Sequence, residues 1–500
     1  MKKGIVITSL ALGCPAIAEN ATAQTAEPIQ GQDNRPNVVF ILADDLGYGD
    51  IGCYGQKRFE TPNIDSLAAQ GMRFTRCYSG TTVSAPSRAC LLTGLHSGHA
   101  PVRGNIETPP EGQFPLPEME NIFLLFKENG YRTGVFGKWG LGAPGTVGDP
   151  SAQGVDEFFG YNCQLLAHNY YPDHLWENDR KIILEDNADG GFGTYSQDLI
   201  HEKALEFIDT NAGNPFFLFL PYVLPHAELL VPEDSILEKF SGRYPETPYK
   251  GCDSGPAFRK GGYCSQPEPR ATFAAMVYRL DMYVGQVVGK LEEKGILGNT
   301  LIIFASDNGP HKEGGADPDF FDSNGIYRGY KRDLYEGGIR VPFIAVWNGI
   351  IGQGSESGHT MAFWDLLPTF REILENCGGS APDSETASDG ISILPELTGK
   401  GRQKEHEWLY FEFQEEGGKQ AVISGNMKLI RLRASSPDGS IWELYDLEND
   451  PGEDRNLLDE ENISGKYRRI ATRLRAVMER EHVPDPSWPL LEEEFHYAYL

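Results

Sequence analysis

The sequence predicts an α/β fold in which a wound sheet is flanked by helices. Three continuous apolar runs, at 37–43, 216–220 and 301–305, have the composition of strands buried on both faces, as in a parallel sheet. Helical segments alternate with these runs along the chain, which is typical of wound α/β sheets. The length of 500 residues predicts a large domain and a smaller one.

Local signals predict the elements between these runs. Helices are expected at 63–70, 122–129, 196–211 and 271–295, and a short strand at 133–136. Thr61-Pro62 and Ser196 have the character of N-caps, and Gly130 of a helix stop. Apolar side chains recur at helical spacing over 271–295, so this face is predicted to join the core and not a cofactor pocket.

The composition changes near Cys377. Residues 378–390 are rich in Gly, Ser, Pro and Asp and are expected to form a linker or long loop. Beyond them, four short strands of a small antiparallel sheet are predicted at 408–413, 421–424, 428–433 and 442–445, and a helix at 466–481. We therefore expect a catalytic domain over 35–376 and a C-terminal α+β subdomain over 391–500.

The N-terminus has the pattern of a signal peptide over 1–23. Lys2 and Lys3 precede an apolar stretch at 5–18, and the small residues at 21–23 fit a cleavage site. The stretch is too short to span a bilayer stably. A lipoprotein is disfavoured because Leu12 stands two residues before Cys14, where a small residue is preferred. The expected location is periplasmic or secreted.

Charge and cysteine content limit the possible partners. The chain has 44 basic and 72 acidic side chains, a net charge of −28, which argues against nucleic acid or an anionic membrane surface. An anionic substrate would need a locally positive pocket. Of eight cysteines, Cys252 and Cys264 flank a Gly/Pro-rich loop and either pair in an oxidising compartment or remain buried thiols.

Two groups of oxygen-bearing side chains follow predicted buried strands. Asp44-Asp45 comes just after the first strand, and Asp307-Asn308 just after the strand at 301–305. In wound sheets, ligands bind beyond the carboxyl ends of the strands. Carboxylate and amide oxygens suit Ca²⁺ or Mg²⁺ better than zinc. Either pair alone could instead be an Asx turn or a helix cap.

The run Ser84-Ala85-Pro86-Ser87-Arg88-Ala89-Cys90-Leu91-Leu92-Thr93-Gly94 is the most informative segment. In one interpretation it is a helix start, with Ser84 as cap and Pro86 in the first turn. Such a terminus points unpaired N–H groups at an anion. The run also resembles the signature of the type I sulfatases, Ser/Cys-x-Pro-x-Arg followed by Leu-Thr-Gly. The resemblance implies that Ser84 is oxidised to formylglycine, whose hydrate attacks sulfur, with Arg88 holding the nucleophile or neutralising charge.

A second resemblance lies in Gly137-Lys138-Trp139-Gly140-Leu141-Gly142, which is similar to the family's Gly-Lys-Trp-His-Leu-Gly. It implies that Lys138 contacts the sulfate and the oxygen of the nucleophile. Gly140 stands where the family has a histidine that helps to release sulfate. His168 is the predicted stand-in and His99 a weaker one, although a lone loop histidine is often only a polar surface residue.

Two further motifs match in the family's order. Pro225-His226 is similar to the family's Pro-His element, which implies that His226 protonates the leaving oxygen. Lys331, five residues before the run 336–342, matches a family lysine that neutralises the sulfate. In that run, Glu336 and Arg340 are expected to hold the backbone.

Between these motifs lies a polar loop whose side chains could bind sugar hydroxyls: His311, Glu313, Asp317, Asp322, Asn324 and Arg328. Of these, His311 is predicted to bind substrate. A merely solvated loop is an equal alternative.

Taken together, the resemblance implies an alkaline-phosphatase-like fold, with a large mixed sheet flanked by helices and a small C-terminal antiparallel sheet. It implies that a Ca²⁺ ion is held by the formylglycine at Ser84 and by Asp44, Asp45, Asp307 and Asn308. Mg²⁺ is the less favoured ion. Similar bacterial enzymes desulfate galactose or N-acetylgalactosamine. Serine at position 84 implies maturation by an anaerobic-type sulfatase-maturing enzyme. Two alternatives remain: a phosphomonoesterase or phosphodiesterase that uses unmodified Ser84, and a non-catalytic binder of sulfated glycans.

Overall fold

The large sheet of the computed structural model combines a parallel centre with antiparallel strand pairs on both sides of it. The structure describes residues 35–254, 258, 261–380, 388–436, 438–459 and 464–495. Its strands lie in the order β10-β2-β9-β8-β1-β7-β3-β4-β5-β6, with β11 paired to β2. They span β1 Asn37–Ala43, β2 Met72–Tyr78, β3 Arg132–Lys138, β4 Glu157–Tyr161, β5 His174–Glu177, β6 Arg180–Ile183, β7 Phe216–Pro221, β8 Thr300–Ser306, β9 Arg340–Trp347, β10 Ser355–Ser357 and β11 Met361–Ala362.

The five central strands, β8-β1-β7-β3-β4, are parallel. Strand β9 is antiparallel to both β8 and β2, and β5 and β6 continue the opposite edge in antiparallel pairs. The prediction of a large mixed sheet is therefore confirmed.

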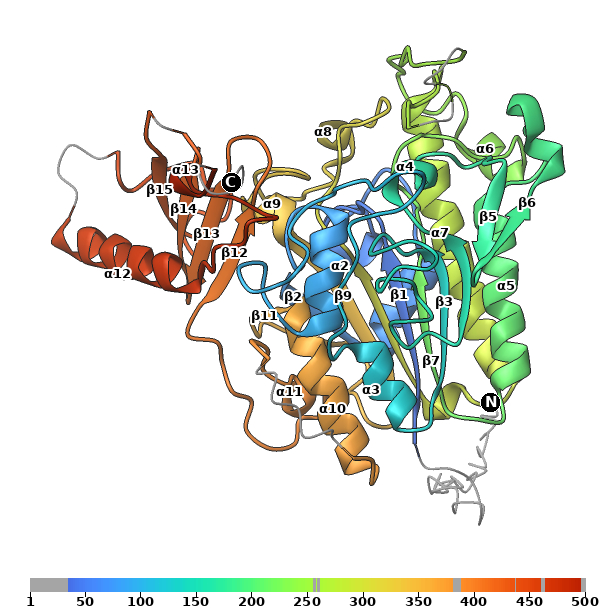
Figure 1. The fold of residues 1–500 in the computed structure, drawn as a ribbon, viewed down its shortest axis with the longest axis horizontal. Coiled ribbons are helices and arrows are strands. Elements are labelled where there is room, and N and C mark those ends of the chain that lie inside the picture. The colour runs from blue at the N-terminus through green and yellow to red at the C-terminus, as the bar shows by residue number, and fades with distance from the viewer. Residues whose placement is uncertain are drawn as a thin grey trace, which may run out of the picture. The chain divides into compact units, whose positions relative to one another are not determined.

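Helices cover both faces of this sheet (Figure 1). They span α1 Pro62–Gln70, α2 Ser84–Thr93, α3 Ile122–Glu128, α4 Gln164–Ala167, α5 Ser196–Asn211, α6 Ser235–Phe240, α7 Pro269–Glu293, α8 Pro318–Phe321, α9 Glu336–Ile339, α10 Leu366–Asn376 and α11 Leu394–Thr398. Side chains alternate across β1, so Val39 and Ile41 pack in the core under α1, α5 and α7. Val38 and Phe40 pack on the other face, under α2, α3 and α10.

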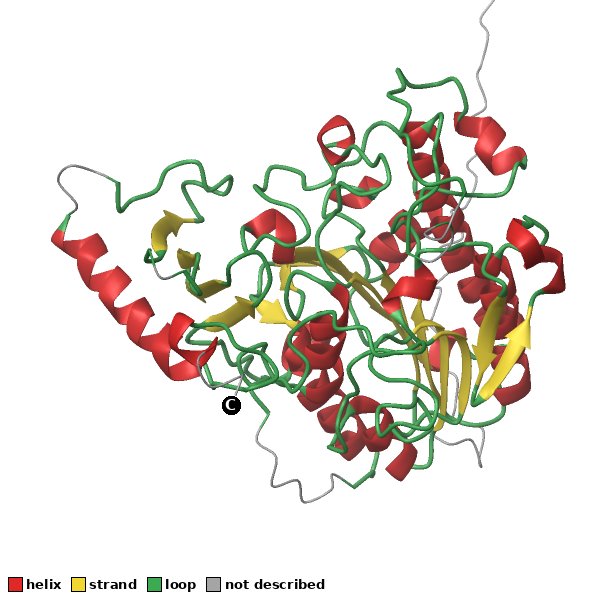
Figure 2. Ribbon diagram, turned by 45° about the horizontal axis from the view of Figure 1, so that its top comes forward, coloured by secondary structure: helices red, strands yellow, loops and turns green. Residues whose placement is uncertain are grey.

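The C-terminal part has its own four-stranded antiparallel sheet, in the order β12-β13-β14-β15. Its elements span β12 Leu409–Phe413, β13 Lys419–Ser424, β14 Met427–Leu432, β15 Ile441–Asp446, α12 Gly465–Glu481 and α13 Glu492–Phe495. Helix α12 covers its outer side (Figure 2), where Leu474 and Met478 pack on Tyr410 and Leu429. The small sheet was predicted from the four short apolar runs, and the structure confirms it.

Residues 35–500 form a single compact unit by their contacts, so the boundary between 376 and 391 stays a prediction. The predicted signal peptide, Cys14 and much of the predicted linker (381–387) lie outside the described residues. Cys252 and Cys264 both carry free thiols. Among the described residues, no helix has the length and apolar character needed to cross a membrane.

Thr61 is the N-cap residue of α1, followed by Pro62 as predicted, but its side chain makes no capping bond. The prediction that Ser196 caps its helix is wrong, because the cap is Tyr195 and Ser196 is the first residue of α5. The Thr61 hydroxyl instead accepts from Gly52 N at 2.8 Å and donates to Asp65 Oδ1, and Ser196 Oγ donates to the Tyr170 carbonyl. In both cases a tertiary partner takes the hydroxyl from the helix end.

Candidate active site

The two predicted oxygen groups meet at the carboxyl edge of the sheet. Strands β1 and β8 are parallel neighbours, with Ala43 opposite Ser306, so the residues that follow them come together. Asp45 N donates to Asp307 Oδ1 at 3.1 Å, and Asn308 Nδ2 donates to Asp45 Oδ1 at 2.7 Å. These residues and Asp44 are fully buried.

This cluster has the donor set of a site for a hard cation. The Oδ1 atom of Asn308 is buried and has no hydrogen-bond partner among the described residues. Burial, and next to it the charge of Asp44, raises the pKa of Asp307 to about 6, so the carboxylates repel one another. A divalent cation would offset that repulsion and satisfy the amide oxygen, and all the donors are oxygen atoms. Ligand atoms of Asp44, Asp45 and His226 also lie within 4.8 Å of one another.

Ser84 opens helix α2 directly beside this cluster. Its Oγ donates to Asp44 Oδ1 at 2.9 Å, and Lys138 Nζ lies 3.4 Å from the same Oγ. The alternative in which Ser84 caps the helix is wrong, because the cap is Val83 and Ser84 is the first helical residue. The hydroxyl therefore faces the carboxylate cluster, at the N-terminus of α2.

Three cations pair with the carboxylates beside Ser84. Arg88 Nε and Nη2 both donate to Asp307 Oδ2, at 3.1 and 2.9 Å. Lys138 Nζ lies 2.6 Å from Asp44 Oδ2, and Lys331 Nζ lies 2.9 Å from Asp45 Oδ2.

Burial and these cations shift the pKa values of the groups around Ser84. Burial works to raise the pKa of Asp44, but Lys138 and the other cations hold it well below its usual range. Burial also lowers the pKa of Lys138. Cations and carboxylates are thus interleaved here: Arg88, Lys138 and Lys331 pair with the buried carboxylates of Asp44, Asp45 and Asp307.

Three imidazoles stack along one wall of the site. The ring centroids of His226 lie 5.0 Å from His168 and 5.6 Å from His311. His226 Nδ1 contacts the Ala227 carbonyl, which leaves Nε2 to accept from Lys331 Nζ at 2.9 Å. Burial, and then Lys331, lowers the pKa of His226 to about 4.

Two histidines were predicted to stand in for the one missing at Gly140. His168 lies in the histidine stack of the site, and His99 does not. Burial holds the pKa of His168 well below its ordinary value, and its buried Nδ1 atom has no partner among the described residues. His99, past the far end of α2, pairs with Asp389 at 3.0 Å and stacks on His96.

His311 lies in the site, but both of its ring nitrogens have partners. Nδ1 accepts from Glu313 N at 3.1 Å, and Nε2 lies 3.2 Å from the Pro225 carbonyl. The ring thus supports the stack, and its direct contact with substrate stays a prediction.

The rest of the polar loop is mostly structural. Asp317 caps α8 and pairs with Arg270, and Arg328 donates to the Glu453 carbonyl at 2.8 Å. Asn324 donates to backbone carbonyls of its own turn. Since these groups already have partners, the alternative of sugar binding by this part of the loop loses support.

Sequence reasoning missed several groups that touch the site. Glu313 Oε2, expected only as a sugar ligand, accepts from Lys331 Nζ at 3.2 Å and from Tyr263 Oη at 2.9 Å. Asn105 Oδ1 accepts from Ala85 N at 3.0 Å. Glu313 could have been found from its place beside His311, whereas no pattern singles out Tyr263 or Asn105.

Glu336 and Arg340 lie away from the nucleophile. Glu336 is buried and accepts from Tyr78 Oη at 2.8 Å, from Lys428 Nζ at 3.0 Å and from Arg340 Nη1 at 3.1 Å. Tyr78 belongs to β2 and Lys428 to β14, so Glu336 links the large sheet to the small one.

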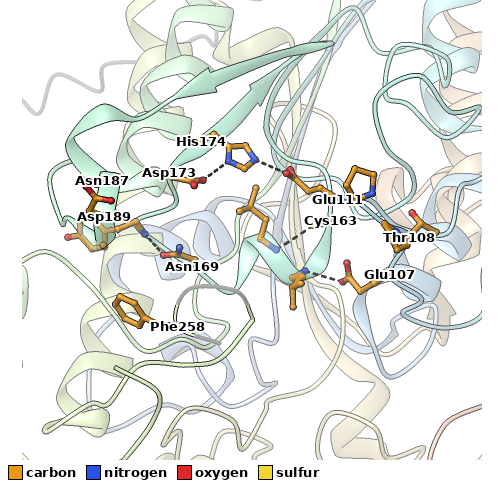
Figure 3. Close-up of a pocket in the computed structure, with 16 residues that line it drawn as sticks. Glu107, Thr108, Glu111, Cys163, Asn169, Asp173, His174, Asn187, Asp189 and Phe258 are labelled. Carbon is orange, nitrogen blue, oxygen red and sulfur yellow. Dashed lines mark hydrogen bonds and ion pairs between the residues drawn. The ribbon is translucent and has the colours of Figure 1, made fainter. Parts of the chain in front are cut away.

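A cavity of about 690 Å³ lies beside the start of α4 (Figure 3). Leu165 and Leu166 line it, together with the carboxylates of Glu107, Glu111 and Asp173. Among the described residues, its lining holds no lysine, no arginine and no member of the Ser84 cluster. The described lining is acidic, unlike the Ser84 cluster with its three paired cations.

Fold and site together define a class of protein. A hydroxyl lies at a helix N-terminus, between an oxygen-only cation site and three buried cations, at the carboxyl edge of a wound sheet. Such a site suits a hydrolase that acts on an anionic ester.

The comparisons with known proteins specify the class further. The sulfatase family model matches residues 36–375, and the model "N-sulphoglucosamine sulphohydrolase, C-terminal" matches residues 325–481. Human arylsulfatase A is 32% identical over 85% of this chain and 83% of its own length. The N-acetylgalactosamine-6-sulfatase of Rattus norvegicus is 32% identical over 73% of this chain and 66% of its own length.

Solved structures agree with this assignment. Ps i-CgsB, solved in complex with k-i-k-neocarrahexaose, is 28% identical and has a TM-score of 0.74. The match covers 92% of this chain and 96% of Ps i-CgsB. The phosphonate monoester hydrolase of Agrobacterium radiobacter shares the fold, with a TM-score of 0.61 at 20% identity. The chain belongs to the sulfatase family, and its activity is that of a sulfuric ester hydrolase.

Proposed function

We propose that this enzyme removes a sulfate ester from a carbohydrate, a galactose or N-acetylgalactosamine sulfate of a glycan, with Ser84 matured to formylglycine and with bound Ca²⁺. The observation that supports this most directly is the Ser84 hydroxyl, held by Asp44 at 2.9 Å beside Lys138 at 3.4 Å. The names of the rat and carrageenan-bound relatives favour a sugar substrate.

The residues present fit a Ca²⁺ ion. Asp44, Asp45, Asp307 and Asn308 would hold it with the oxygen of residue 84, and the unpartnered Oδ1 of Asn308 supports this assignment. When bound, the ion would supply positive charge at the nucleophile, and the hydrated aldehyde would supply a hydroxyl more acidic than that of serine.

The chain's own groups would then divide the work. Arg88, Lys138 and Lys331 surround the place of the anion and offset charge on the sulfate oxygens; such preorganised charge is usually the largest catalytic contribution. Lys138, within 3.4 Å of Ser84 Oγ, also orients the nucleophile.

His226 is the proposed acid for the leaving sugar oxygen. In the absence of substrate, the low pKa of His226 keeps the ring neutral, and its Nε2 accepts from Lys331. A bound sulfate would place negative charge beside the ring and raise this pKa, which favours the protonated acid. A well-placed acid contributes roughly 10²- to 10⁴-fold in rate. Asp307 is the proposed proton acceptor at the nucleophile, and His168 the proposed group for sulfate release.

The maturation partner and the location belong to the same proposal. A serine-type formylglycine site needs an anaerobic-type sulfatase-maturing enzyme, and the lysines and apolar stretch at the N-terminus support export to the periplasm or beyond.

Release of sulfate and of phosphate from paired sugar esters is the experiment that tests this function. We expect turnover of sulfated galactose or N-acetylgalactosamine and at least about 10³-fold less of the phosphate analogue. The oxygen cluster suits one cation, and the Lys331 ammonium already lies between Asp45 and Glu313, at 2.9 and 3.2 Å, where a second metal would otherwise bind.

The other outcomes separate the alternatives. Faster phosphate release would favour a phosphatase. Glycan binding without release of either group would favour a non-catalytic binder, which the Ser84→Ala variant tests further: it should lose turnover and keep glycan binding.

A further inference from the structure

The backbone after β3 is closely held against the backbone after β4. Trp139 N donates to the Tyr161 carbonyl at 2.8 Å, and Gly140 N donates to the Asn162 carbonyl at 3.0 Å. Gly140 has a φ of +75°, which a glycine adopts without strain. The position that carries a histidine in the similar sequences is therefore tied to the segment that leads into α4.

The amide of Gln164 occupies the space that a side chain at position 140 would enter. A Cβ atom built on Gly140 would lie 2.3 Å from Gln164 Nε2, closer than any real contact allows. Gln164 is 6% exposed, and its Nε2 is buried without a hydrogen-bond partner among the described residues. The backbone N–H of Gln164 donates to Gln113 Oε1 at 3.1 Å, which fixes the start of the helix.

Gln164 and His168 lie on one side of α4, and the cavity lies on the other. Residues four apart share a helix face, and His168 stacks on His226 in the site. Leu165 and Leu166 line the cavity instead. Both Nε2 of Gln164 and Nδ1 of His168 are buried without a partner among the described residues, and we expect both on the side of α4 where His168 stacks on His226.

A buried NH₂ group without a partner is costly to keep, so its partner is expected to arrive with a ligand. The nearby cations favour an anion as that ligand. Lys138 lies two residues before Gly140, and Lys331 contacts His226, on which His168 stacks. An amide N–H donates well to a sulfate oxygen and carries no charge of its own.

We propose that Gln164 is a substrate-binding residue whose Nε2 donates a hydrogen bond to an oxygen of the sulfate group, in the space left open by Gly140. This inference rests on the proposed function. A carboxamide does not titrate, so Gln164 binds the group but transfers no proton, and His168 is the titratable side chain on this face of α4.

Binding of inorganic sulfate to the intact protein, measured by calorimetry, tests the inference. We expect Gln164→Ala to weaken sulfate binding by about tenfold, the typical effect of one charge-assisted hydrogen bond. Gln164→Glu has the same shape but places a carboxylate against the anion, so it should weaken binding further. Gly140→Ala should act like Gln164→Ala, because its methyl group displaces the amide. The matched control is Gln70→Ala on the surface of α1, whose amide bonds Ser66, and it should bind sulfate as the wild type does.

Sulfate affinity within twofold of wild type in both Gln164 variants would overturn the inference, as would the absence of saturable sulfate binding to the wild-type protein. Loss of the folded protein in both variants would make Gln164 a structural residue and overturn it too. The measurement needs no turnover, so the two proposals fail separately. Weakened sulfate binding in an enzyme that hydrolyses no sulfate ester would leave this inference standing and remove the proposed function.

Discussion

The Oγ of Ser84 donates to Oδ1 of Asp44 at 2.9 Å, and this single bond joins the nucleophile position to the carboxylate cluster. The other oxygen of Asp44 accepts from Lys138 at 2.6 Å. One buried carboxylate therefore links the helix that carries Ser84, the strand that carries Lys138 and the cation site.

Removal of divalent cations should destabilise the protein. The buried carboxylates repel one another without a counter-ion, and a ligand present at 100 times its Kd stabilises by about 2.7 kcal/mol. We expect a chelator to lower Tm and added Ca²⁺ to restore it.

The variant Asn308→Ala tests where the cation acts, because it removes the unpartnered Oδ1 and should reduce the Ca²⁺ response. Asp389→Asn is the control: Asp389, with His96 and His99, forms another group of metal-type ligands, and its variant should keep the response. A Tm that ignores both chelator and Ca²⁺ would contradict the assignment.

Lys138→Met should lower kcat by roughly 10²- to 10³-fold, the usual effect of losing one preorganised charge at a reacting anion. It should also destabilise the fold, because among the described residues Asp44 then keeps a single ion pair, the longer one with Arg88 at 3.5 Å. The exposed lysine Lys127 on α3, which pairs with Asp156, provides the control as Lys127→Met. Steady-state kinetics and thermal unfolding measure both effects, and equal behaviour of the two variants would refute the role of Lys138.

Arg88→Lys should cost about 10²-fold in kcat although it keeps the charge. A lysine cannot reproduce the forked contact of Nε and Nη2 with Asp307 Oδ2 together with the Nη1 bond to the Lys138 carbonyl. The same change at the exposed Arg132, which forks onto Glu157, should leave kcat within twofold. A normal rate for Arg88→Lys would mean that charge alone is needed at this position.

The end of α12 should lose stability in mild alkali. Burial works to lower the pKa of His482, but hydrogen bonds to Glu412 at 2.7 Å and Glu494 at 2.6 Å raise it to about 9. A histidine whose folded pKa lies above its unfolded value of 6.5 stabilises fully below pH 6.5, and this contribution is lost as the pH rises through 9.

His482→Gln should therefore flatten the dependence of the unfolding free energy on pH between 6.5 and 9, by an amount on the order of 2 kcal/mol. Urea unfolding across that range measures it. A slope that is unchanged in the variant would show that His482 does not carry the effect.

The centre of the fold could be predicted because its signals are local. Strands β1, β7 and β8 are continuous apolar runs, and the parallel arrangement places whatever follows them at one edge. That logic is enough to predict that Asp44 and Asp307 lie together.

Strands β2 and β9 were not predicted, for physical reasons. Charged residues such as Arg73 and Arg76 interrupt β2, and Pro342 near the start of β9 argues against a strand with two neighbours. Their pairing is set by tertiary contacts, including the Tyr54 hydroxyl, which bonds to the Phe343 backbone.

The stack of histidines in the site could not be predicted from the sequence. His168, His226 and His311 follow three different strands, and only their packing makes them one stack. The departure at Gly140 was visible as a missing histidine, but the residue that fills its place, Gln164, stands 24 positions further along the chain.

Mass spectrometry of the peptide that contains Ser84, taken from protein of known specific activity, tests the central claim most directly. The account predicts a peptide lighter than the unmodified one by two hydrogen atoms, in a fraction that rises in proportion to sulfate-ester turnover. Full turnover by protein in which Ser84 is entirely unmodified would contradict it.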